Sequence, residues 1–61
     1  MSEDVEIECD VLRETEMAYL IHDGKVEAWI PKSQVSDTSE SGGNIDSIFI
    51  PEWLAENNDL L

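Results

Sequence analysis

Basic side chains are scarce in this chain of 61 residues, which has three Lys or Arg against fifteen Asp or Glu and a formal net charge of −12. A surface with this excess of negative charge repels the phosphates of nucleic acids and the head groups of anionic membranes. The composition therefore excludes direct nucleic-acid binding and membrane association, and it favours a protein partner with a basic surface. Repulsion among the carboxylates should also weaken the folded state at low ionic strength, so we expect salt to stabilise it.

Metal and thiol ligands are equally scarce, because Cys9 and His22 are the single residues of their kinds. One cysteine allows no internal disulfide, and one Cys and one His cannot supply the four ligands of a structural zinc site. The acidic residues also lack the spacing of a calcium-binding loop. We therefore expect no metal and interpret His22 as a polar residue beside a turn. Cys9 alternates with apolar residues, which predicts a small buried hydrophobe rather than a reactive thiol.

No arrangement of residues typical of catalysis is present. His22 and Asp23 are neighbours in sequence, Ser33 is distant, and nothing marks an oxyanion hole. The pair Gly42-Gly43 lacks the flanking Gly and Lys of a phosphate-binding loop. Carboxylates that face water are not desolvated, as a general acid at neutral pH must be. The sequence therefore predicts a protein that is not an enzyme and needs no cofactor.

Long apolar runs are also missing, since the longest covers only residues 17–21. The first four residues include Glu3 and Asp4 and no base, where a secretory signal would be basic. We therefore expect no membrane-spanning segment and a location in the cytoplasm. The hydrophobic fraction of 41% still matches that of folded proteins, so the sequence predicts one small domain over residues 1–61.

The clearest structural signal is a period-two alternation of apolar residues. Within residues 15–34, two β-rich runs flank the turn residues Asp23-Gly24. Gly24 can adopt the positive φ of a tight turn, so this segment predicts a β-hairpin. Pro31 cannot donate a ladder hydrogen bond and suits the first position of a helix, so a single helical turn should follow the second strand.

Other segments complete the predicted fold. Residues 4–12 alternate as one half-buried strand, and residues 13–16 suit a bulge or a tight turn. Residues 36–44 have the composition of a mobile polar loop. A fourth strand is expected at residues 45–50, and a short helix should begin at Pro51. The predicted fold class is therefore mainly β, a small α+β fold with a three- to four-stranded twisted antiparallel sheet or partial barrel and a short C-terminal helix. The expected core is Val5, Ile7, Cys9, Val11, Tyr19, Ile21, Val26, Ala28, Ile30, Phe49, Trp53 and Leu54.

Two tryptophans supply much of the apolar surface of so small a chain. Trp29 shares its side of the strand with Glu27, opposite to Ala28 and Ile30. We expect Trp29 to pack in the core beside Trp53, because a large ring at the end of a sheet usually packs under a terminal helix. The alternative is that Trp29 is exposed and binds a partner.

Carboxylates recur along the first predicted strand, where Glu6, Glu8 and Asp10 alternate with apolar residues. Such a row repeats every ~6.8 Å, about twice the axial step between phosphates along one DNA strand, and could imitate a phosphate backbone. The other interpretation is a solvated face that only prevents aggregation. The sequence alone favours this second interpretation, and a charge of −12, which exceeds the magnitude of about 2 to 8 that suffices for solubility, shifts the balance slightly toward a binding role. The candidate partner-binding residues are Glu6, Glu8, Asp10, Glu14, Glu16, Glu27 and Trp29.

Three blocks of sequence, residues 14–18, 29–35 and 50–56, begin with Glu14, Trp29 and Ile50. Together they resemble a family of short acidic proteins encoded by bacteriophages and prophages. The resemblance implies a phage setting and the cytoplasm of a bacterial host, and it transfers no catalytic residue.

Two functional hypotheses follow for a small phage protein without an active site. The first is a nucleic-acid mimic that inhibits a host protein, for example a defence system such as a CRISPR effector. The second is an accessory or adaptor protein that binds a phage replication or recombination enzyme through its Trp and loop surface. For the protein itself we expect a monomer, or a dimer that tightens with salt because screening reduces the repulsion between copies.

Overall fold

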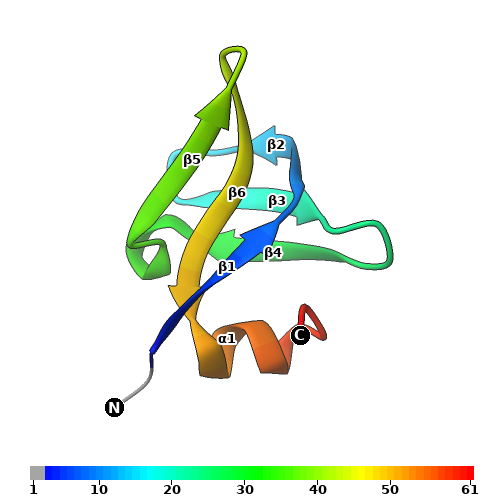
Figure 1. Ribbon diagram of the computed structural model, residues 1–61, viewed down its shortest axis with the longest axis vertical. Helices are drawn as coiled ribbons and strands as arrows, with labels where there is room; N and C mark the ends of the chain where they lie inside the picture. Colours follow the sequence, from blue (N-terminus) through cyan, green and yellow to red (C-terminus); the bar gives the residue numbers. More distant parts are fainter. Residues whose placement is uncertain (1–2) are drawn as a thin grey trace.

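The computed structural model describes residues 3–61, and strands dominate this length (Figure 1). Six strands form two antiparallel sheets, and a short C-terminal α-helix follows, which confirms the predicted mainly β class. The number of strands exceeds the three or four expected from the sequence. In chain order the elements are β1 (Asp4–Glu8), β2 (Asp10–Glu14), β3 (Ala18–His22), β4 (Glu27–Pro31), the 3₁₀ turn η1 (Lys32–Gln34), β5 (Asp37–Ser41), β6 (Asn44–Pro51) and α1 (Glu52–Asn57).

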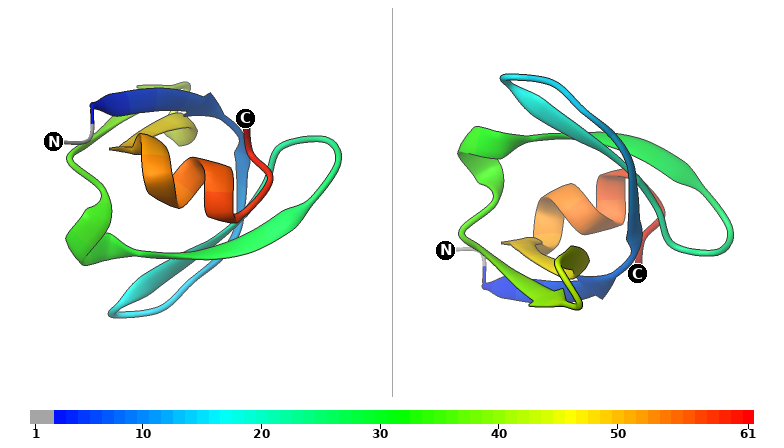
Figure 2. Two further views of the ribbon diagram at one scale, coloured as in Figure 1. Left: turned by 90° about the horizontal axis from the view of Figure 1, so that it is seen from below. Right: turned by 90° about the horizontal axis from the view of Figure 1, so that it is seen from above.

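Strands from the two ends of the described chain build one sheet, and strands from its middle build the other. The terminal sheet has the order β1-β6-β5, and the central sheet has the order β2-β3-β4. Figure 2 shows strands of both sheets arranged around one interior, with α1 across one end. Each sheet therefore turns one side toward a shared core and the other side toward water.

The chain passes from the terminal sheet to the central sheet at Cys9. β1 ends at Glu8 and β2 begins at Asp10, and the Cys9 N–H donates to the Asp46 carbonyl oxygen (3.1 Å). The prediction of one continuous first strand was therefore wrong. The alternation of buried and exposed residues continues through this corner, since Ile7 and Cys9 are buried and Glu8 between them is exposed. The sequence pattern therefore could not reveal where β1 ends.

The predicted hairpin is present as β3 and β4, which pair in antiparallel register. Gly24 in its loop has a φ of +104°. The Asp23 carboxylate accepts hydrogen bonds from the backbone N–H groups of Val26 and Lys25 (2.9 Å each). These hydrogen bonds to the ionised form hold the pKa of the Asp23 carboxyl below its usual value.

A tight turn connects β2 to β3 and is one of the two alternatives predicted for residues 13–16, whereas the bulge lies earlier, within β2. The bulge shifts the register between Val11 and Arg13. The Thr15 hydroxyl oxygen accepts hydrogen bonds from the N–H groups of Met17 (3.2 Å) and Ala18 (3.0 Å) and so closes the turn.

The segment predicted as a mobile loop over residues 36–44 is instead mainly the edge strand β5 and a tight turn to β6. The turn consists of Gly42 and Gly43, whose φ values are +61° and +85°. An edge strand is held by backbone hydrogen bonds and needs few apolar side chains, and here Thr38 and Ser39 occupy the half-buried positions. Its polar composition therefore resembled that of a loop.

The core draws on both sheets and on α1. Its fully buried large side chains are Ile21 and Ile30 from the central sheet and Ile48 and Ile50 from the terminal sheet. The sequence predicted the first pair but not the second. Of the other predicted core residues, four are buried, five are half-buried and one is exposed: Ile7, Cys9, Ala28 and Leu54; Val5, Val11, Tyr19, Val26 and Phe49; and Trp53. Ala55 and Leu60 are also buried, although the sequence did not predict them in the core.

Both tryptophans lie outside this core, so the prediction that they pack together inside it was wrong. Trp29 is 50% exposed and Trp53 is 45% exposed. On α1 the positions facing the interior belong to Leu54 and Ala55, because a helix of six residues presents only one narrow stripe to the core.

Two prolines mark the ends of strands. Pro31 and Pro51 are extended and precede η1 and α1 as N-cap residues, one position earlier than the predicted first helical position. The predicted helical turn and helix are otherwise confirmed. Within residues 3–61, no helix is both long enough and apolar enough to cross a membrane.

Candidate partner-binding surfaces

Charge is divided unequally between the two sheets. Residues 3–9 and 36–61, which form the terminal sheet, α1 and their flanks, carry ten of the fifteen carboxylates and neither Lys nor Arg. Residues 10–35, which form the central sheet and η1, carry the other five carboxylates and all three bases. The negative charge is therefore concentrated on one half of the molecule.

The predicted acidic row is interrupted where the chain changes sheets. Glu6 and Glu8 project from β1 and are exposed, whereas Asp10 lies beyond the corner in β2. Ser47 of β6, which is buried, donates its hydroxyl hydrogen to the Glu6 carboxylate (2.7 Å). This hydrogen bond fixes the direction of one carboxylate while it remains accessible to a partner.

A further carboxylate, that of Asp46, joins this group and was missed by the sequence analysis. One hollow of about 280 Å³ is lined in part by Glu6, Glu8 and Asp46. A neighbouring hollow of about 450 Å³ is lined in part by Glu8, Asp10, Asp23 and Asp46. Because Asp46 belongs to β6, only the pairing of β1 with β6 brings it here, and alternation within one strand does not specify its neighbour. We call these five carboxylates the acidic patch.

Cys9 lies beneath the acidic patch and is buried, as the sequence predicted. Burial, together with the smaller effect of the negative charges of Asp10, Asp23 and Asp46, raises the pKa of its thiol to about 11. The thiol is therefore protonated at neutral pH and is a poor nucleophile.

Glu14 is already paired within the chain. Its carboxylate forms an ion pair with the Lys32 ammonium, and this is the only ion pair among residues 3–61. The same ammonium lies 4.9 Å from the centroid of the Tyr19 ring. Lys32 therefore joins η1 to β2 and β3, and a cation in this environment is held by both a carboxylate and an aromatic face.

Two other acidic candidates lie on the central sheet and its turns. Glu16 occupies the bend between β2 and β3, and Glu27 is exposed on β4 opposite His22. His22 stands beside the hairpin loop as predicted, and its Nδ1 accepts a hydrogen bond from the Gly24 N–H (3.2 Å). Within the described chain, no group of three or more His, Cys, Asp or Glu residues is placed to hold a metal ion.

The outer side of the central sheet carries exposed apolar side chains. Trp29 is paired with Leu20, and Leu20 is paired with Arg13, so these residues form a row across the three strands. Leu12 at the bulge and Met17 in the turn are 50% and 75% exposed. We call these three exposed side chains, Leu12, Met17 and Trp29, together with the half-buried Leu20, the apolar face.

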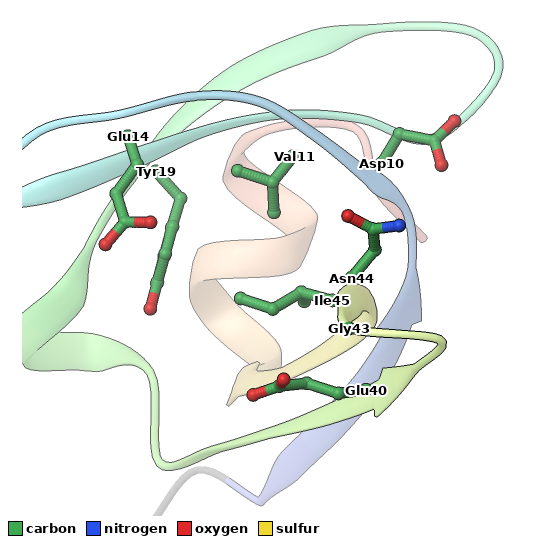
Figure 3. Close-up of a pocket in the computed structure, with 8 residues that line it drawn as sticks. All are labelled: Asp10, Val11, Glu14, Tyr19, Glu40, Gly43, Asn44 and Ile45. Carbon is green, nitrogen blue, oxygen red and sulfur yellow. The ribbon is translucent and has the colours of Figure 1, made fainter.

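A groove opens between the central sheet and the β5-β6 hairpin, and α1 lies at the other end of the molecule (Figures 1 and 3). Its volume is about 590 Å³. Its apolar lining consists of Val11, Tyr19 and Ile45, which are partly buried against the core. The rest of the lining is Asp10, Glu14, Glu40, Gly43 and Asn44.

Comparison of the chain with models of known protein families, with curated proteins and with solved structures gave no match. A functional assignment therefore depends on the surfaces described above.

Proposed function

We propose that this protein works without catalytic turnover, by binding a basic surface with which a larger protein normally holds nucleic acid. The observation that carries the proposal is the charge of the terminal sheet and α1, where ten carboxylates occur with no Lys or Arg. A surface with only negative charges attracts a basic partner at long range and repels competing acidic surfaces. The acidic patch joins three of these carboxylates, those of Glu6, Glu8 and Asp46, to those of Asp10 and Asp23 from the other half.

Mimicry of phosphates in this proposal uses a patch instead of a single row. Glu6 and Glu8 come from β1 and Asp46 from the neighbouring strand β6, whereas Asp10 comes from β2 and Asp23 from the loop between β3 and β4. Carboxylates spread over two sheets can face several basic side chains of a cleft at once. Arg and Lys residues that bind phosphates accept carboxylates with similar geometry.

The setting that we propose is a bacterial cell infected by a phage. The resemblance to short acidic phage proteins supports it, as does the suitability of a small acidic inhibitor for nucleic-acid-binding defence proteins such as CRISPR effectors. In this setting the protein acts in the host cytoplasm, and its target is a host defence or regulatory protein.

The experiment is a pull-down from host lysate, with and without phage infection, followed by competition with DNA or RNA. Binding should weaken steeply with salt, and nucleic acid should displace the partner. The double variant Glu6→Gln/Glu8→Gln should lose at least about tenfold in affinity, since two charge-assisted contacts are worth that much or more. Its matched control is Glu16→Gln/Glu27→Gln, which removes the same charge from the other half of the molecule and should bind nearly as well as the wild type.

Binding that resists both salt and nucleic acid would contradict mimicry. Equal losses in the two double variants would show that only the total charge matters. Circular dichroism of each variant separates lost contacts from lost folding.

A second function, that of an adaptor for a phage replication or recombination enzyme, is favoured by the apolar face. Trp29 is half exposed on this face, and aromatic side chains that become buried on binding usually dominate protein interfaces. An adaptor of this kind should bind with little dependence on salt and should lose affinity in Trp29→Ala. The control is Trp53→Ala, because Trp53 has similar exposure but lies on α1.

A further inference from the structure

The groove between the central sheet and the β5-β6 hairpin combines an apolar floor with an acidic rim. Val11, Tyr19 and Ile45 supply the floor, and each is only partly buried, so the groove leaves apolar surface accessible. In Figure 3 the side chains of Tyr19 and Glu40 border the groove at two sides, and those of Val11 and Ile45 lie in its middle. The Asp10 carboxylate points away from the floor. The other two carboxylates of the lining are those of Glu14, beside Tyr19, and Glu40, and we call them the rim.

The chain itself places a cation at one border of this groove. The Lys32 ammonium lies 4.9 Å from the Tyr19 ring centroid and pairs with Glu14, although Lys32 does not line the groove. This contact shows that the border of the groove binds a positive charge, which lies between an aromatic ring and a carboxylate. Glu40 on the opposite side has no such partner among the ion pairs of residues 3–61.

We propose that this groove receives a single Lys or Arg side chain of the partner protein. The proposal rests on the proposed function, because it takes the partner surface to be basic. The aliphatic stem of the side chain would lie on Val11 and Ile45, and its charged end would reach Glu40 beside the Tyr19 ring. Long basic side chains commonly bury their methylene groups on apolar surface while the charge stays hydrated or paired. A volume of about 590 Å³ accommodates one such side chain with water.

The lining distinguishes this ligand from other classes. A neutral apolar ligand would leave the rim carboxylates without a favourable contact, and an anion would be repelled by them. A metal ion would make no use of the apolar floor, and no metal-ligand group is present in the described chain. A ligand with both an apolar stem and a positive end uses every part of the lining.

The test uses the whole protein and a probe peptide in which one arginine is flanked by glycines, followed by NMR titration. The control peptide carries citrulline, which has the same shape without the charge. The arginine peptide should shift the amide signals of Val11, Tyr19 and Ile45, and the citrulline peptide should bind several-fold more weakly. Equal affinity for the two peptides, or shifts confined to other residues, would overturn the proposal.

Four single variants locate the cation. Glu40→Gln should weaken the arginine peptide by about threefold, whereas Glu56→Gln, an equal change of charge on α1, should weaken it less. Lys32→Gln frees Glu14 and one side of the Tyr19 ring and should tighten binding more than Lys25→Gln does. Equal effects within either pair would mean that the cation responds only to the net charge.

The outcomes separate this inference from the proposed function. If the two glutamate variants weaken the peptide equally, the groove assignment is wrong while a charge-driven function stands. If the peptide occupies the groove but the lysate partner is insensitive to salt and nucleic acid, the groove stands and mimicry is wrong.

Discussion

The two sheets contribute equally to the interior and differently to the surface. Each supplies two fully buried isoleucines, Ile21 and Ile30 from the central sheet and Ile48 and Ile50 from the terminal sheet. On their outer sides, the terminal sheet presents carboxylates without a basic residue, whereas the central sheet presents the apolar face and Arg13. Both sheets are therefore needed to form the core. A basic partner would bind the terminal sheet, and an apolar partner would bind the central sheet.

This difference also affects stability. Carboxylates on the terminal sheet and α1 repel one another with no Lys or Arg nearby in sequence, whereas on the central sheet Lys32 pairs with Glu14. Net charge of one sign weakens a compact state through self-repulsion. The cost should therefore be concentrated in the terminal sheet, and the predictions below examine this contrast.

The largest expected effect is the loss of a shared core residue from either sheet. Ile48→Ala and Ile30→Ala should each lower the free energy of unfolding by about 2 to 5 kcal/mol, because each leaves a cavity in the same interior. A domain of this size has little stability to lose, so Ile48→Val and Ile30→Val, with expected losses of about 0.5 to 1.5 kcal/mol, are the practical variants. Urea unfolding measures them, and a large loss in only one sheet would contradict a common core.

The next effect is that of salt, which should act unequally on the two sheets. Raising NaCl from low concentration to about 0.1 M shortens the Debye length to about 10 Å and should raise the Tm, by roughly 4 to 8 °C for each kcal/mol gained. Amide hydrogen exchange should slow more in β1, β5 and β6 than in β3 and β4. Uniform slowing across both sheets would show that the repulsion is not localised.

A smaller effect is expected from the two exposed tryptophans. Trp53→Ala and Trp29→Ala should each cost about 1 kcal/mol or less, well below the about 3 to 5 kcal/mol of a buried tryptophan. Trp29 packs beside Leu20 on its own sheet, and such cross-strand pairs are worth only about 0.2 to 1 kcal/mol. Thermal melts of both variants measure this loss. If either variant failed to fold, that tryptophan would be part of the core after all.

The smallest effect under ordinary conditions is that of Cys9, at the corner between the sheets. Its pKa is raised from 9.0 to about 11, so the folded protein holds the thiol proton more tightly than the unfolded chain does. The resulting stability is fully present below pH 9 and is lost as pH rises through 11. The urea midpoint should be nearly the same at pH 7 and pH 9 and clearly lower at pH 10.5, and Cys9→Ala should remove this part of the fall.

Local signals in the sequence predicted the parts of the fold that depend on neighbouring residues. Alternation and the Asp23-Gly24 turn located the hairpin, and Pro51 located the helix. β5 was missed because an edge strand with polar side chains has no alternation of apolar residues. The prediction for Trp29 was wrong because alternation shows on which side of the strand its ring lies. It does not show whether a second layer of the protein covers that side.

The candidate surfaces were less predictable than the strands. Glu6 and Glu8 were identified from one strand, but Asp46 joins them only through the register of β1 against β6. The groove joins β2 and β3 to the β5-β6 hairpin, so Tyr19 and Glu40 come together from distant parts of the sequence. Long-range pairing decides both surfaces, and no local pattern specifies it.

The order in which the sheets assemble follows from the position of β1 in the chain. β2, β3 and β4 pair with their sequence neighbours, whereas β1 pairs with β6, and Glu6 and its partner Ser47 are 41 positions apart. Closing such a long loop loses conformational entropy before favourable contacts between β1 and β6 can form. Strands that are neighbours in sequence therefore pair earlier. We expect the central sheet to be structured in the folding transition state and β1 to dock afterwards. Substitutions in β1 should then accelerate unfolding and leave the folding rate nearly unchanged.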